Sequence, residues 1–223
     1  MVALFVLAMF LTILTLDLAV LKFRGKNHPA FEPSFSGQDL LIFDGNNFSV
    51  PPGIFLSKGH TWLKKNEEGV IDVGVDPLGA MVLGKSPGLQ FAGEGRTLRR
   101  GEVIFEGTVE GQIIKFLSPV NGIVKSVNPD FSGNLISDPY GRWGLRIISN
   151  DLEENRRRYL SGNGALSWMK KEFIKLKRFI DLRSPGLELA GATMYDGGIL
   201  SGETVSSFAY LNAKDFEKEF LSL

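Results

Sequence analysis

The stretch Leu117-Ser118-Pro119-Val120-Asn121-Gly122-Ile123-Val124 decides the fold that we predict for this chain. It joins two β-branched runs, residues 113–117 and 122–127, through a segment whose proline and glycine favour a turn. Outward from it, similar short runs occur at residues 70–75 and 103–109, again close to glycine or proline. Short strands with frequent turns predict a small, mainly β sandwich or barrel and not a βαβ fold.

The composition is that of a folded protein, and it excludes several kinds of chemistry. Hydrophobic residues make up 43% and charged residues 22%, which argues against long disordered segments. Lys+Arg and Asp+Glu are equal at 25 each, so nothing favours nucleic-acid binding. Without cysteine the chain has no disulfide, no thiolate metal site and no cysteine nucleophile.

Catalytic and metal-binding patterns are also missing. The two histidines, His28 and His60, are far apart in the sequence, and phosphate-binding glycine motifs do not occur. Acids such as Asp72, Asp76 and Glu106 lack the spacing of a paired acid and base. We therefore predict no catalytic residues, no metal and no enzymatic activity.

Residues 2–23 are almost continuously apolar, and they are long enough to span a hydrocarbon core of about 30 Å. No basic residue precedes this run and no small-residue cleavage site follows it, whereas Lys22, Arg24 and Lys26 come at its end. The positive-inside rule then predicts an uncleaved, single-pass helix in the inner (cytoplasmic) membrane, with the bulk of the chain on the cytoplasmic side. Asp17 lies either near the cytoplasmic interface or against another membrane subunit.

The rest of the chain divides into three predicted parts. Residues 24–53 form a juxtamembrane segment that packs on the domain behind it, and residues 54–160 form the β-rich domain. Residues 161–223 form a helical C-terminal extension with a short hairpin near residues 186–198. The extension ends in a helix with an apolar face of Phe216, Phe220 and Leu221.

Basic residues mark two places near the start of this extension. Arg156-Arg157-Arg158 is typical of a solvated helix face. Residues 167–180 place apolar residues near helical spacing, with lysines and an arginine between them. This predicts a cationic amphipathic helix that packs on the sandwich, contacts anionic lipid headgroups, or does both.

Several motifs resemble, in the same order, those of the glycine cleavage system H protein family. The resemblance covers roughly residues 55–148, and it implies the barrel-sandwich hybrid, or hammerhead, of lipoyl and biotinyl carriers, with two quasi-symmetric antiparallel sheets. The matching pieces are Phe55 through Trp62, Val73-Gly74-Val75-Asp76, Leu83-Gly84, the turn at residues 98–101, Ser118-Pro119-Val120, Asn134, Asp138-Pro139-Tyr140-Gly141 and Trp143.

The resemblance also implies where a lipoyl group would be attached. In this family the modified lysine lies at a hairpin tip, eight residues before the proline of Ser-Pro-Val, and that count from Pro119 reaches Gly111. Glycine suits a turn because it tolerates positive φ, but it has no amine. Lys115 is the nearest lysine, and we expect it to face solvent within a strand. We therefore expect no lipoate; His60, beside Trp62, is expected to be partly buried and structural.

These patterns predict a non-catalytic, membrane-anchored H-protein-like domain that acts as an interaction or scaffold subunit. Its expected partners are other proteins, such as subunits of a membrane complex, and the lipid bilayer through residues 2–23. The alternative is a lipoyl (aminomethyl or acyl) carrier of a glycine-cleavage-like system, for which Lys115 is the only local acceptor.

Overall fold

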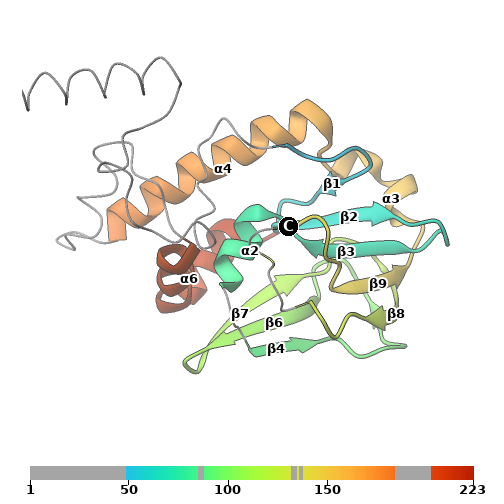
Figure 1. Ribbon diagram of the computed structural model, residues 1–223, viewed down its shortest axis with the longest axis horizontal. Helices are drawn as coiled ribbons and strands as arrows, with labels where there is room; N and C mark the ends of the chain where they lie inside the picture. Colours follow the sequence, from blue (N-terminus) through green and yellow to red (C-terminus); the bar gives the residue numbers. More distant parts are fainter. Residues whose placement is uncertain (1–48, 85–87, 132–134, 136–137, 184–201) are drawn as a thin grey trace, which may run out of the picture. The chain divides into compact units, whose positions relative to one another are not determined.

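Two antiparallel sheets form the body of the protein (Figure 1). The computed structural model describes residues 49–84, 88–131, 135, 138–183 and 202–223, which all belong to one compact unit, Leu41–Leu223. The predicted membrane helix at residues 2–23, most of the juxtamembrane segment and the predicted hairpin near residues 186–198 lie outside the described residues. Among the helices that are described, none has both the length and the apolar character needed to cross a bilayer.

The larger sheet has six strands among the described residues, in the order β1-β2-β3-β9-β8-β5, and every neighbouring pair is antiparallel. The predicted runs at residues 70–75 and 122–127 correspond to β3 and β8. The strands are β1 (Phe55–Leu56), β2 (Thr61–Lys65), β3 (Ile71–Val75), β9 (Leu145–Ile148), β8 (Gly122–Val127) and β5 (Thr97–Leu98).

The smaller sheet has three described strands in the order β4-β6-β7. They are β4 (Gly88–Phe91), β6 (Val103–Val109) and β7 (Gln112–Leu117). The mainly β class with C-terminal helices is therefore confirmed, but the two sheets are unequal. The smaller sheet ends at β7 because the C-terminal segment occupies its outer edge: the amide of Lys115 donates to the Glu217 carboxylate over 2.7 Å.

Aromatic side chains fill the space behind the smaller sheet. Phe105 on β6 and Phe116 on β7 are register partners, and their rings stack with centroids 4.7 Å apart. Phe91 and Phe131 each lie within 6 Å of the Phe105 ring. Such aromatic pairs add about 0.5–1.5 kcal/mol each beyond the area they bury, so this cluster fixes the base of the β6–β7 hairpin.

Two motifs of the family resemblance, which contain Trp62 and Pro139, connect the larger sheet to the loop before β9. Gly74 on β3 lies opposite Trp62 on β2, and the Trp62 indole donates to the Pro139 carbonyl over 2.7 Å. A Cβ atom at position 74 would lie 2.5 Å from the Trp62 ring and 2.7 Å from the Arg142 carbonyl. Position 74 is therefore a glycine because Trp62 and the loop main chain leave no room for a side chain.

Gly74→Ala should lower the free energy of unfolding by about 1–3 kcal/mol, because the added methyl group overpacks a site bounded by a ring and by main chain. Chemical denaturation measures the loss. Gly93→Ala is the matched control, since an added Cβ there meets no atom within 4 Å. Equal stability of the two variants would contradict the close packing of Trp62 on Gly74.

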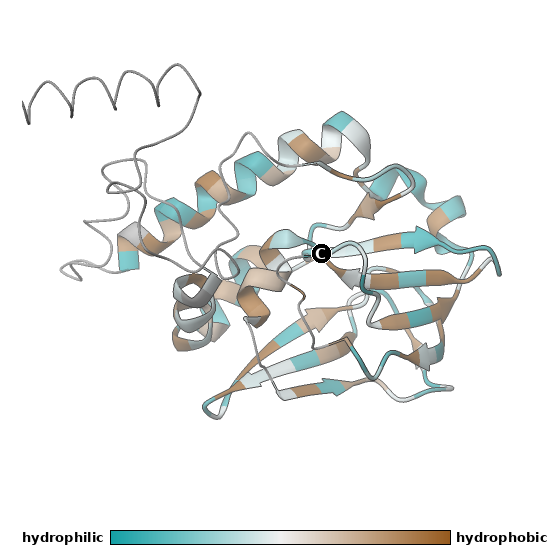
Figure 2. Cartoon of the chain, viewed as in Figure 1, coloured by the Kyte–Doolittle hydropathy of each residue, from teal (hydrophilic) through white to brown (hydrophobic). Residues whose placement is uncertain are grey.

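Helices cover one side of this body. A short helix between β3 and β4 was not predicted; it begins after the Asp76 cap and has proline in its first turn. In Figure 2, hydrophobic and hydrophilic residues alternate along the long helix that follows the sheets. The helices are α2 (Pro77–Leu83), α3 (Asp151–Glu154), η2 (Arg156–Arg158), α4 (Gly162–Arg183), α6 (Gly202–Leu211), α7 (Ala213–Phe216) and the π-helical turn η3 (Glu217–Leu221).

The C-terminal helices pack against one another and against the body. Phe179 of α4 meets the rings of Phe208, Phe216 and Phe220, each at a centroid distance below 6 Å. Phe216, Phe220 and Leu221 are at most 2% exposed, so the predicted apolar face is confirmed. The prediction that the cationic helix packs on the rest of the protein holds for the inner side of α4.

Candidate functional site

The β6–β7 hairpin ends in a two-residue turn that protrudes into solvent. Val109 and Gln112 are the last register partners, and Glu110 and Gly111 between them have φ values of 50° and 81°. Positive φ at both central positions is the requirement of a type I′ turn, whose twist matches that of the two strands. Glu110, Gly111 and Gln112 are exposed, and a Cβ atom at Gly111 would have nothing within 4 Å, so a side chain there would extend into open space. In Figure 1 it projects at the lower left, away from α4.

Gly111, the position that the family resemblance implies for lipoyl attachment, is thus the second residue of the turn. It offers no amine, and the sequence has no lysine between Lys85 and Lys115. Lipoate is attached to these carriers as a lysine amide. The residues at this tip therefore do not fit the group, and we derive no chemistry through it.

Lys115 has the environment of an ordinary strand residue. Its side chain is exposed, and it lies opposite Glu106 in the register of β6 and β7. Its main-chain amide is held by Glu217 of the C-terminal segment. The ammonium group therefore projects from the flank of the sheet and not from its protruding end.

The opposite end of the hairpin is fixed by the loop that follows β7. This loop begins with the family's Ser-Pro-Val motif. The Ser118 hydroxyl donates to the Val120 carbonyl over 2.7 Å, and the Tyr159 hydroxyl donates to the Pro119 carbonyl over 3.0 Å. The Asp151 carboxylate accepts from both the main chain and the side chain of Asn121. This loop sets the end of β7, so the distance from Pro119 to the tip is fixed by the fold.

Helix α6 of the C-terminal extension packs directly on the hairpin. A Cβ atom at Gly107 of β6 would lie 2.5 Å from the Tyr210 hydroxyl and 2.7 Å from Leu83, so the close approach requires glycine. Tyr210 is 3% exposed, and burial raises its pKa to about 12. The extension is therefore part of the structure that supports the hairpin.

A second polar site lies inside the protein, where β2, α2 and α4 meet. His60, immediately before β2, is 0% exposed, and its Nδ1 lies 2.8 Å from Oδ2 of Asp76. The other carboxylate oxygen of Asp76 accepts from the amide of Gly79 and caps α2. On the other side of the imidazole, Nε2 lies 3.7 Å from the Glu172 carboxylate of α4, and the Trp168 ring stacks at 5.0 Å.

This arrangement keeps His60 protonated at neutral pH. Burial alone would lower the pKa of His60, but the charge and hydrogen bond of Asp76, together with Glu172, raise it to about 9. Burial tends to raise the pKa of the Glu172 carboxyl, but His60 and Lys175 outweigh it and hold that pKa below its usual value. The site is a buried ion triad that ties α4 to the body.

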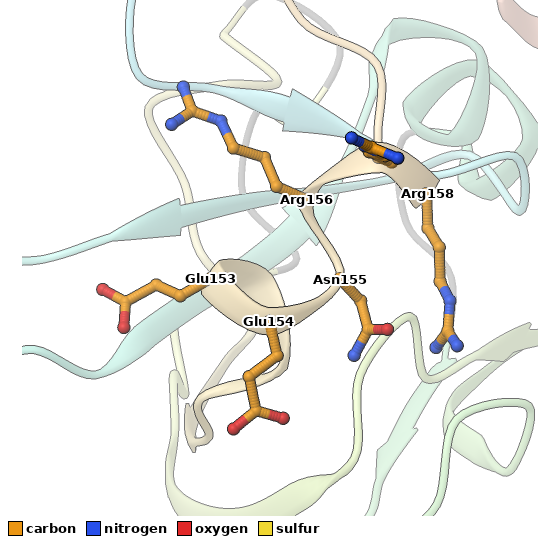
Figure 3. Close-up of a pocket in the computed structure, with 6 residues that line it drawn as sticks. Glu153, Glu154, Asn155, Arg156 and Arg158 are labelled. Atoms are coloured by element: carbon orange, nitrogen blue, oxygen red, sulfur yellow. The ribbon is translucent and has the colours of Figure 1, made fainter.

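Arg156, Arg157 and Arg158 are exposed, as predicted, and line a shallow pocket of about 420 Å³ with Glu153, Glu154 and Asn155 (Figure 3). The labelled arginine side chains point in different directions and do not converge, and the Arg156 guanidinium lies over the Phe55 ring at 5.1 Å. Carboxylates share the pocket, so it is a poor site for an anion. Within the described part of the chain, no group of three acidic or histidine side chains could hold a metal ion.

Sequence reasoning located the hairpin tip but not the triad. His60, Asp76 and Glu172 come from three separate elements, and His60 is fully buried where partial burial was expected. Asp76 followed by Pro77 is a signal for a helix start that could have revealed one of its three members.

An antiparallel two-sheet body that presents a two-residue turn to solvent agrees with the lipoyl carrier-like domain that the sequence resemblance implies. Residues 54–172, which are 119 of the 223 in the chain, match the family model described as "Glycine cleavage H-protein". The chain belongs to this family.

Two proteins with this name and one solved structure are similar to parts of this chain. The probable glycine cleavage system H protein of Pyrococcus abyssi is 27% identical over 132 residues, which are 58% of this chain and 98% of the relative. The glycine cleavage system H protein of Mycobacterium avium is 28% identical over 106 residues, 46% of this chain and 80% of the relative. A crystal structure of the H protein from Mycobacterium marinum aligns with a TM-score of 0.40 at 22% identity, covering 45% of this chain and 87% of that one.

Proposed function

We propose that this chain is a membrane-anchored member of the H-protein family that carries no lipoate and acts as an interaction subunit for other proteins. The observation that carries the proposal is Gly111, which occupies the tip of an otherwise well-formed hairpin. The turn protrudes from the sheet as an attachment point would need to, but the acceptor amine is missing.

Lys115 is a poor replacement for the missing acceptor. A lipoyl amide at Lys115 would start on the flank of β7, three residues beyond Gln112, the first residue of that strand. The Lys115 main chain is bound to Glu217, which fixes it beside the C-terminal segment. A swinging arm needs a protruding attachment point to reach several active sites, and this position does not protrude.

Anchoring of the domain at the membrane also favours an interaction role over a carrier role. The apolar residues 2–23 would hold the domain at the membrane, whereas a carrier has to move between enzymes. A surface suited to protein contact is available on the larger sheet, where Ile123 of β8 and Ile148 of β9 are register partners. These two side chains are 44% and 53% exposed, so an apolar pair faces solvent on neighbouring strands.

Intact-mass analysis of the full chain, purified in detergent from its own membranes, should give the mass of the unmodified polypeptide. Other membrane subunits should co-purify, and Ile148→Asp should lose them while the fold is retained. A lipoyl adduct on wild-type protein that disappears in Lys115→Ala would establish the carrier alternative instead. Recovery of the wild-type chain alone from these membranes would contradict the interaction role.

A further inference from the structure

Helix α4 has two chemically different sides. Its inner side is buried against the body and the C-terminal helices. On its outer side, exposed residues recur every three or four positions, at Lys171, Ile174, Arg178 and Leu182. Ile174 is 53% exposed and Leu182 is 78% exposed. The buried residues of the inner side are Ala165, Met169, Phe173, Leu176, Phe179 and Ile180.

The basic residues of α4 divide in the same way. Lys175 lies 3.1 Å from the carboxylate of Glu219, and Arg183 lies 3.4 Å from that of Asp215, so both cations are used within the fold. Lys175 also lies 4.7 Å from the centroid of the Phe220 ring. These two basic residues stabilise the contact between α4 and the C-terminal segment.

The other four basic residues of the helix differ from Lys175 and Arg183 in their surroundings among the described residues. Lys170, Lys171, Lys177 and Arg178 make no ion pair with any residue that the structure describes. The α4 sequence holds six basic residues and two acids, Glu172 and Asp181, and the Glu172 carboxylate is engaged with His60 and Lys175. The helix therefore keeps an excess of positive charge, and its outer side combines basic residues with exposed aliphatic groups.

We propose that this outer side of α4, called here the α4 face and consisting of Lys170, Lys171, Ile174, Lys177, Arg178 and Leu182, docks on the surface of an anionic bilayer. Interleaved cations and aliphatic side chains on one helix face suit the headgroup region, into which such a helix sinks about 5–10 Å. Each basic residue near an anionic surface favours docking about fivefold. The inference rests on the proposed membrane anchoring, which would keep the domain close to the bilayer.

The chemistry of the α4 face favours a lipid surface over a protein groove. Three of its four cations are lysines, whose compact charge on a flexible stem suits a diffuse negative surface better than a fixed carboxylate. Protein interfaces concentrate their energy in aromatic and arginine anchors. The tryptophan of this helix, Trp168, is instead turned inward, where it stacks on His60.

Docking through the α4 face would also orient the domain. In Figure 1, α4 runs along the side of the body that lies away from β4 and from the β6–β7 turn. The hairpin tip with Gly111 would then point away from the bilayer. It would be presented to proteins that approach from the aqueous side.

The experiment places a nitroxide on the full-length chain in lipid nanodiscs, and the absence of cysteine makes single-site labelling simple. Ser167→Cys puts the label at an exposed position of α4 next to the α4 face, and Thr108→Cys puts the control label at an exposed position of β6. In nanodiscs with phosphatidylserine, the label at position 167 should lose access to a water-soluble nickel quencher. The label at position 108 should keep that access in every lipid.

Charge and salt then test the cause of docking. Lys171→Gln with Arg178→Gln should weaken the docking equilibrium at position 167 about 25-fold, since two basic residues are removed. The matched control, Arg96→Gln with Arg99→Gln, neutralises two exposed cations beside β5 and should change nothing. Protection should also fall between 0.1 M and 1 M salt, because the Debye length shrinks from about 10 Å to about 3 Å.

Two results would overturn the inference. One is an equally accessible label at position 167 in neutral and anionic nanodiscs. The other is protection of that label by an acidic co-purifying protein and not by lipid. Co-migration of the chain with nanodiscs of either composition tests the anchor separately. A chain that co-migrates but leaves α4 in water would refute the α4 face alone.

Discussion

A Gly111→Lys variant should be lipoylated when it is produced beside an active lipoate-attaching enzyme, whereas the wild-type protein stays unmodified. The reason is geometric. Position 111 is the second residue of a type I′ turn, a Cβ atom there would meet nothing within 4 Å, and the strands beneath it are paired up to Val109 and Gln112. A lysine there would extend its amine beyond the end of the sheet, and intact mass would show one lipoyl adduct.

The lysine side chain introduced at position 111 strains the backbone of the turn. Gly111 has φ of 81°, and a non-glycine residue in the left-handed region costs about 1–2 kcal/mol. The cost falls on a solvent-exposed turn whose two strands are anchored by the phenylalanine cluster at the base of the hairpin, so the fold should survive. Gly111→Gln carries the same backbone cost without the amine and is the matched control for stability.

A second lysine position sharpens the test. Glu110→Lys places an amine on the same turn but one residue earlier, at φ of 50°. If the lipoate-attaching enzyme recognises the exact position of the lysine in the turn, Glu110→Lys should be modified less than Gly111→Lys. A folded Gly111→Lys chain that stays unmodified, under conditions that modify an ordinary H protein, would show that the domain has lost more than its lysine.

The sequence could locate this tip because its determinants are local. Gly111 lies a fixed number of residues from Pro119, and β6 pairs with β7, the next strand in the sequence, across a two-residue turn. The Asp138-Pro139-Tyr140-Gly141 motif is similarly compact, because the Gly141 amide donates to the Asp138 carboxylate within the turn. Motifs of this kind can be recognised in the sequence without knowledge of the rest of the fold.

The buried triad could not be predicted, because its members are distant in sequence and belong to different patterns. Asp76 is 16 residues from His60. Glu172 belongs to a helix whose charges resemble an ordinary solvated face. Helix α2 escaped prediction because all seven of its residues are buried, and a short helix that is apolar on every side has no amphipathic periodicity.

Loss of the Asp76 carboxylate should be the most destabilising change in the domain. Asp76→Ala leaves the protonated His60 buried without its closest counterion, and breaking a buried pair costs about 3–5 kcal/mol. The same carboxylate caps α2 through the Gly79 amide, and loss of a cap adds about 1 kcal/mol. Chemical denaturation at pH 6.5 should show the full effect.

Asp72→Ala is the matched control for this loss. Asp72 also pairs with a cation, Arg146, at 3.1 Å, but the Arg146 side chain is 32% exposed. Ion pairs open to solvent contribute about 0.2–1 kcal/mol. After about 1 kcal/mol is subtracted for the α2 cap, the contrast between positions 76 and 72 measures the effect of burial, and equal losses would contradict it.

The pH dependence of the free energy of unfolding shows whether His60 stabilises the protein through its charge or through packing. The pKa of His60 is about 9 in the folded protein and 6.5 when unfolded, so its stabilising contribution is complete below pH 6.5 and is lost as the pH rises through 9. That contribution amounts to about 3 kcal/mol by linkage. Glu172, with its lowered pKa, acts in the opposite direction and only at acidic pH.

His60→Asn provides the decisive comparison. Position 60 has φ of 56°, which asparagine tolerates better than most residues, and its amide can still donate to Asp76. The variant cannot carry a positive charge, so its free energy of unfolding should lack the wild-type decline between pH 6.5 and 9. If wild type and His60→Asn instead followed parallel curves over this range, His60 would contribute through packing on Trp168 and Phe220. The contact between α4 and the body would then not depend on its charge.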